Sequence, residues 1–168
     1  MNLYMISLGG KAKGCNIEVH DVQFAAASHI DETVELLKAQ WYGLGEKLHM
    51  DSYKLLNGAQ GYSIRLTKEK PVTSQKLYFV HFGGYKTEST QELHDIGLFV
   101  GSSDKEVKDR AEKEFLVADI ENHVDSLILV EDVILSAESE KYYIELSEST
   151  QGFDLAPDWF GYRRLDLF

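Results

Sequence analysis

The chain has 168 residues, which suits one domain of ordinary size or two very small units that share a core. Its 28 acidic residues outnumber the 17 basic ones, which gives a net charge of −11. The sequence has no cluster of Lys and Arg that could bind phosphate groups, so nucleic acid and anionic membranes are not expected partners. One cysteine excludes an intramolecular disulfide and a multi-cysteine zinc site, and without a signal-peptide pattern or an apolar run of about 20 residues we expect a soluble cytoplasmic protein.

The first predicted element is a strand at residues 3–8, an apolar run that Gly9-Gly10 would close as a turn. A loop leads to a second strand at residues 17–26. Alternation along that strand would put Glu18 and His20 on one face and Asp21 on the other.

A helix is predicted next, because Ser28 and Glu32 are typical of a helix start and apolar residues follow at helical spacing, namely Val34, Leu37 and Trp41. A third strand is predicted at residues 48–56. Asn57-Gly58 is a strong turn signal, and a fourth strand is predicted at residues 62–66, which makes the last two strands a hairpin.

The second half repeats the first. The stretch Glu18-Val-His-Asp-Val-Gln-Phe24 recurs 74 positions later as Glu92-Leu-His-Asp-Ile-Gly-Leu98. Without a gap, the same offset superposes Leu3-Tyr4, Gly9-Gly10, Ser28, Glu32 and His49-x-Asp51-Ser52 on identical residues. So many identities at one fixed offset indicate an internal duplication. The connection after residue 130 is longer in the second half, and we interpret it as a longer hairpin.

We therefore predict an α+β protein made of a duplicated ββαββ unit, with residues 1–67 as first repeat, 68–75 as linker and 76–147 as second repeat. Each half is near the lower size limit for an independent core, so the halves should pack as one pseudo-symmetric body. Their four-stranded sheets would join edge to edge or pack helix to helix. The aromatic C-terminal extension, residues 148–168, should cover a sheet face or edge, or seal a homodimer contact.

Residues 14–24, Gly-Cys-Asn-Ile-Glu-Val-His-Asp-Val-Gln-Phe, together with Leu-His-Met-Asp-Ser-Tyr at residues 48–53, are similar to the bacterial family DUF1543, whose domain occurs in one or two copies. The resemblance spans both halves and is stronger in the first, because Ser89-Thr-Gln91 replaces Cys15-Asn-Ile17 in the second. It implies a soluble bacterial protein of unknown function, and it brings no assigned activity or cofactor.

The best candidate site residues are two imidazoles and two carboxylates in each repeat: Glu18, His20, His49 and Asp51, with their copies Glu92, His94, His123 and Asp125. Within a strand, each pair lies two residues apart and shares a face, so the four could converge if both strands face one layer. The first interpretation is a structural network of buried hydrogen bonds; contact with a ligand comes next, and a metal last.

No motif assigns metal ligands, because a helical His-Glu-x-x-His pattern and a cysteine set are both missing from the sequence. Trp41 and Phe115 are interpreted as core anchors of the two helices. The preferred functional hypothesis is a non-catalytic module that binds a small ligand, in a cleft between the halves, or another protein. The alternative is a metal-dependent or acid–base enzyme that uses the duplicated Glu-x-His and His-x-Asp sets.

Overall fold

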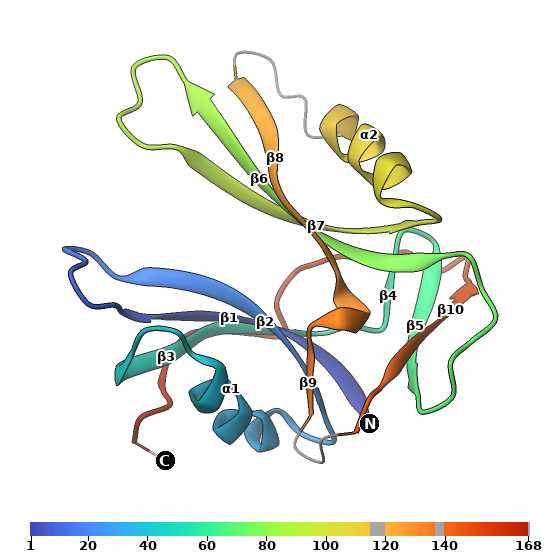
Figure 1. Ribbon diagram of the computed structural model, residues 1–168, viewed down its shortest axis with the longest axis horizontal. Coiled ribbons are helices and arrows are strands. Elements are labelled where there is room, and N and C mark those ends of the chain that lie inside the picture. The colour runs from blue at the N-terminus through green and yellow to red at the C-terminus, as the bar shows by residue number, and fades with distance from the viewer. Residues whose placement is uncertain (115–119, 137–139, 168) are drawn as a thin grey trace.

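The computed structural model of the chain describes residues 1–114, 120–136 and 140–167 (Figure 1). Its described helices are α1 (Val34–Gln40) and α2 (Asp104–Glu114), with 3-10 turns at Ile30–Thr33 and Val130–Asp132. The strands are β1 (Asn2–Lys11), β2 (Val19–Ala27), β3 (Leu44–Leu55), β4 (Gly58–Ala59), β5 (Tyr62–Thr67), β6 (Lys76–Lys86), β7 (Leu93–Gly101), β8 (Ile120–Leu129), β9 (Ile134–Ser136), β10 (Tyr143–Glu148) and β11 (Trp159–Arg164). The predicted α+β class is confirmed. Within the described residues, neither helix is long and apolar enough to cross a bilayer.

Two of the sheets follow one plan. In the first-repeat sheet, β1 lies between β2 and β3, and in the second-repeat sheet, β6 lies between β7 and β8, all with antiparallel pairing. Helix α1 follows β2, and α2 follows β7, so the order strand, strand, helix, strand occurs twice. This recurrence agrees with the duplication that the sequence predicts.

The two repeat sheets face each other, and each helix covers the outer face of its own sheet (Figure 1). Between the sheets lies a core to which both repeats contribute: Leu3, Met5 and Phe24 from the first, Leu77, Phe79, Leu98 and Val100 from the second, and Leu56, Ala59, Val130 and Ile144 beside them. Because this apolar layer is shared, neither repeat sheet has a complete core without the other. Packing of helix against helix, one of the predicted arrangements, is wrong.

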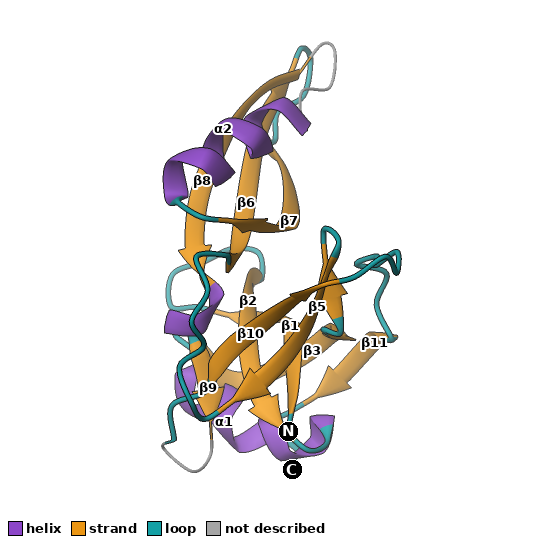
Figure 2. Ribbon diagram, turned by 90° about the vertical axis from the view of Figure 1, so that its right-hand side faces the viewer, coloured by secondary structure: helices purple, strands orange, loops and turns teal. Residues whose placement is uncertain are grey.

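The fourth strands also depart from the prediction. β5 and β10 leave their own repeats and pair with each other in an antiparallel shared sheet of order β10-β5-β4 (Figure 2). The predicted hairpins of β3 with β5 and of β8 with β10 are therefore wrong. The longer connection in the second half carries β9, which pairs in parallel with β2 of the first repeat. Pairing across the repeats thus adds backbone hydrogen bonds to the shared apolar core.

A repeated serine and glutamate cap both helical segments. The backbone N–H of Ser28 donates to the Glu32 carboxylate at 2.9 Å, and that of Ser102 donates to the Glu106 carboxylate at 2.9 Å. Such a carboxylate satisfies a backbone donor that the first turn would otherwise leave unpaired. The prediction of a helix start in both halves is confirmed, although the first begins with a 3-10 turn.

The helix α1 packs as its spacing predicts, with Val34, Leu37 and Trp41 all buried against the first-repeat sheet. Its counterpart α2 buries Val107 and Ala111. Phe115, the predicted anchor of the second helix, lies outside the described residues.

The C-terminal extension forms an edge strand. β11 pairs with β3 at the border of the first-repeat sheet, and Leu165 is fully buried in the core beneath α1. The extension therefore covers a sheet edge, which is one of the alternatives predicted for it.

Candidate functional site

A glycine in the middle strand opens space for the candidate residues of each repeat. Gly9 of β1 lies directly between His20 of β2 and His49 of β3 in the hydrogen-bonded register. A Cβ at Gly9 would lie 2.5 Å from His49 Nε2. The predicted turn at Gly9-Gly10 is therefore wrong, because both glycines continue the strand, and the missing side chain lets residues of the flanking strands meet over it.

Gly83 has the same place between His94 and His123 in the second repeat. A Cβ there would come within 2.5 Å of Glu92 Oε1, 2.7 Å of Asp125 Oδ2 and 2.8 Å of His123 Nε2. The duplicated glycines thus mark the floor of a duplicated polar site.

A register shift in the third strand of each repeat brings the aspartates to these floors. The pairing of β1 with β3 jumps from Ser52 to Met50, and that of β6 with β8 jumps from Ser126 to Val124. The residue left over is Asp51 in one case and Asp125 in the other. Such a bulge re-aims the side chain that it carries, and bulges are over-represented beside functional sites.

In the first cluster, which consists of Glu18, His20, His49 and Asp51, each imidazole lies near both carboxylates. His20 Nε2 is 3.3 Å from Glu18 Oε1 and 3.8 Å from Asp51 Oδ2. His49 Nε2 is 3.8 Å from Glu18 Oε2 and 3.3 Å from Asp51 Oδ1. Burial raises the pKa of Asp51, and the charge of Glu18 adds to this, whereas His49 and His20 oppose it. All four residues proposed from the sequence therefore converge.

The tautomer of His49 follows from its backbone contact. His49 is almost completely buried, and its Nδ1 lies 2.8 Å from the carbonyl oxygen of Lys47. Since a carbonyl can only accept, Nδ1 carries the proton, and a neutral ring then presents the Nε2 lone pair to the carboxylates. The ring of Tyr162, from β11, packs against the His49 ring, with centroids 4.1 Å apart and an angle of 33° between the ring planes.

Asp166 fixes the backbone that holds His49. Lys47 adopts a left-handed φ of 63°, and its N–H donates to Asp166 Oδ2 at 2.9 Å. The guanidinium of Arg164 binds the same carboxylate, with Nε donating to Oδ1 at 2.6 Å. The extension that follows β11 thus positions a residue of the first cluster.

We expect Asp166→Asn to lower stability at neutral pH and to lose this effect in acid. The Arg164 guanidinium and, after it, the Lys47 N–H hold the pKa of Asp166 well below its ordinary value of 3.8. A depressed folded-state pKa gives stability that is present above the unfolded-state pKa and is lost as the pH falls towards the folded value. Urea denaturation should therefore show a gap between wild type and variant that narrows from about pH 5 to pH 3. A gap of constant size would contradict this assignment.

The second cluster contains one residue more: His81, Glu92, His94, His123 and Asp125. His123 Nε2 lies 2.7 Å from Asp125 Oδ1 and 3.2 Å from Glu92 Oε1. On the other side, Asp125 Oδ2 lies 3.3 Å from His81 Nδ1 and 3.7 Å from His94 Nδ1. Each oxygen of Asp125 thus faces a different set of imidazoles.

Glu92 is held inside the second cluster. Its Oε1 is shielded from water and has no hydrogen-bond partner among the described residues, although His123 Nε2 is 3.2 Å away. A hydrogen bond to the Glu92 carboxylate raises the pKa of Tyr85. The Tyr85 ring also stacks on His123 at 5.7 Å. A buried acceptor without a donor is costly unless a cation or a proton satisfies it.

Sequence reasoning missed His81, which stands where the first repeat has Ser7. The two residues differ, so this position is not among the identities at the 74-residue offset. The chain has six histidines, and five of them lie in the two clusters; only His29 lies outside. This concentration of histidines is the signal in the sequence that could have pointed to His81. The repeated Asp21 and Asp95 have another role: each accepts the backbone N–H of the next residue at 2.8 Å.

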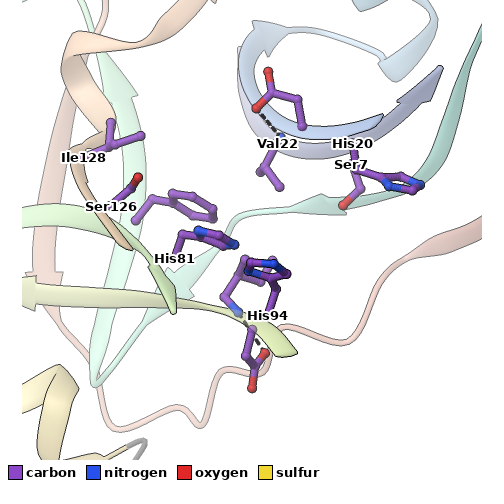
Figure 3. A pocket seen from close by; sticks show the side chains of 11 residues that line it. Ser7, His20, Val22, His81, His94, Ser126 and Ile128 are labelled. Atoms are coloured by element: carbon purple, nitrogen blue, oxygen red, sulfur yellow. Dashed lines mark hydrogen bonds between the residues drawn. The ribbon is translucent and has the colours of Figure 1, made fainter. Parts of the chain in front are cut away.

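One cavity, of about 440 Å³, connects the two clusters (Figure 3). The first repeat contributes Ser7, His20, Asp21 and Val22, and the second contributes Phe79, His81, His94, Asp95, Ile96, Ser126 and Ile128. Figure 3 shows His20 on one wall, with His81 and His94 on the wall across from it. The rings of His81 and His94 stack with centroids 4.9 Å apart. The volume of the cavity falls within the range of small-molecule binding sites.

Comparison with known proteins gives a family and a solved relative, but no activity. No curated protein matches the chain significantly. The crystal structure of protein Il1583 from Idiomarina loihiensis is 32% identical, with a TM-score of 0.76, and the match covers 98% of this chain and 97% of that one. The family described as Domain of Unknown Function (DUF1543) matches residues 15–66 and 89–146, one region in each repeat. With both regions matched, the chain belongs to the DUF1543 family.

Proposed function

We propose that this protein is a ligand-binding module whose ligand is a divalent transition-metal ion, bound at each of the two clusters. The observation that carries the proposal is the spacing of ring nitrogens and carboxylate oxygens. Ligand atoms about 2.1 Å from a tetrahedral ion lie about 3.4 Å apart. The four contacts of the first cluster measure 3.3 Å and 3.8 Å, twice each, and they involve both oxygens of Glu18 and both oxygens of Asp51.

The second cluster supports the same proposal with a tighter arrangement. Atoms of Glu92, His123 and Asp125 all lie within 4.8 Å of one another, and so do those of His81, His94 and Asp125. The buried Oε1 of Glu92 accepts no hydrogen bond from the described residues, and a cation bound beside it would compensate its negative charge. Polar networks that serve only the fold pair donors with acceptors, whereas the Nε2 lone pair of His49 in the first cluster faces carboxylate oxygens, because the ring proton is on Nδ1.

The ligand chemistry indicates the class of metal. Imidazole nitrogens with carboxylate oxygens suit Zn²⁺, Mn²⁺ or Fe²⁺, and the only thiol, Cys15, is exposed. Binding without catalysis is the simpler form of the proposal. A metal-dependent or acid–base enzyme would use the same residues, and turnover by the metal-loaded protein would establish that alternative.

His123→Ala should weaken Zn²⁺ binding at the second cluster by at least about tenfold, since His123 Nε2 faces both Glu92 and Asp125. Isothermal titration calorimetry of metal-free protein measures this change. The matched control is His29→Ala, which removes the exposed histidine outside both clusters and should leave the isotherm unchanged. Equal binding by the two variants, or no Zn²⁺, Mn²⁺ or Fe²⁺ binding by the wild type, would refute the proposal.

A further inference from the structure

We propose that the second cluster holds a pair of metal ions bridged by the carboxylate of Asp125, whereas the first cluster holds a single ion. This inference rests on the proposed function and deepens it, because it assigns a different metal content to each repeat. It follows from the one residue by which the clusters differ, His81 in place of Ser7.

The two oxygens of Asp125 serve two separate groups of ligands. Oδ1 lies 2.7 Å from His123 Nε2, which in turn lies 3.2 Å from Glu92 Oε1. Oδ2 lies 3.3 Å from His81 Nδ1 and 3.7 Å from His94 Nδ1. Paired ions in proteins lie about 3.5–4 Å apart, a separation that one bridging carboxylate can span.

Both groups are compact enough to bind an ion. The atoms of each three-residue group lie within 4.8 Å of one another, and Asp125 is the only member of both. The first group, with Glu92 and His123, lies over Gly83 at the floor. In the second group, His81 and His94 line the cavity between the repeats. Three protein ligands leave open positions on an ion, so oxygen donors of a molecule in the cavity would complete the second ion's coordination.

The first cluster lacks the residue needed for a second ion. Asp51 Oδ2 faces His20 Nε2 at 3.8 Å, and Ser7, at the place that corresponds to His81, offers a hydroxyl instead of an imidazole nitrogen. A neutral hydroxyl is a weaker ligand for these metals than an imidazole. The duplication thus provides an internal comparison between a one-ion and a two-ion site.

Exchange of the two residues tests the inference in both directions. His81→Ser makes the second cluster resemble the first, and Ser7→His makes the reverse change; each residue is already accommodated in one of the repeats. We expect Mn²⁺-loaded wild type to show the electron paramagnetic resonance spectrum of a spin-coupled pair together with that of an isolated ion. His81→Ser should lose the coupled spectrum and one Mn²⁺ per chain.

Ser7→His should raise the Mn²⁺ content by one ion per chain, because it gives the first cluster the imidazole that it lacks, and no gain would contradict the role assigned to His81. Uncoupled Mn²⁺ in the wild type, or an unchanged spectrum and metal content in His81→Ser, would overturn the two-ion assignment. The single-ion function would survive that result, because His123→Ala tests it separately. Circular dichroism of His81→Ser before loading establishes that a lost signal is not a lost fold.

Discussion

Gly83→Ala is expected to abolish metal binding at the second cluster while the fold is retained. The added Cβ would lie within 2.8 Å of three proposed ligands at once, which are Glu92, His123 and Asp125. All three contacts are with ends of side chains, so the side chains swing aside and the strand stays in place. We expect the affinity for Zn²⁺ at this cluster to fall by at least about 100-fold, more than removal of one ligand would cause.

Gly45→Ala is the matched control for this substitution. Gly45 also lies in a strand, and a Cβ there would meet no atom within 4 Å. Calorimetric titration with Zn²⁺ and urea denaturation should show normal binding and stability for this variant. Gly9→Ala should act on the first cluster, because its Cβ would lie 2.5 Å from His49 Nε2. Unchanged Zn²⁺ binding in Gly83→Ala would mean that the convergence over this glycine is not the binding site.

The candidate site was largely predictable because duplication repeats its chemistry at a fixed offset. The repeat singles out Glu18, His20, His49 and Asp51, and two-residue spacing predicts that the members of each pair share a face of an extended strand. What spacing could not show is that β1 lies between the two strands that carry them. Strand order depends on contacts distant in sequence, and without it the repeated glycines resembled a turn.

Most strands and the helix of each repeat were predictable, whereas the pairing of the strands was not. Local patterns gave the strands and helices, since apolar periodicity and capping act over a few residues. The exchange of β5, β9 and β10 between repeats depends on which sheet edges are free in the folded protein. Alternation of apolar and polar residues along a strand indicates which face is buried, but it does not determine which strand pairs with it.

Phe24→Ala is expected to destabilise the whole protein by about 3–5 kcal/mol, the usual cost of emptying a buried phenylalanine site. Phe24 is 2% exposed and packs edge-on against Phe79 of the second repeat, with ring centroids 5.5 Å apart. Because this contact joins the two repeat sheets, both repeats should lose stability in one cooperative transition. Urea denaturation followed by tryptophan fluorescence and by circular dichroism should give coincident curves.

Phe160→Ala is the control, because Phe160 is 78% exposed at the edge strand β11 and its removal should change stability by less than about 0.5 kcal/mol. A double-mutant cycle of Phe24 and Phe79 should show coupling of about 0.5–1.5 kcal/mol beyond the separate effects. Two resolved transitions would mean that the repeats fold independently, and additive effects would mean that this aromatic pair does not couple them. The walls of the cavity come from both repeats, so repeats that fold independently would not hold these walls at a fixed distance.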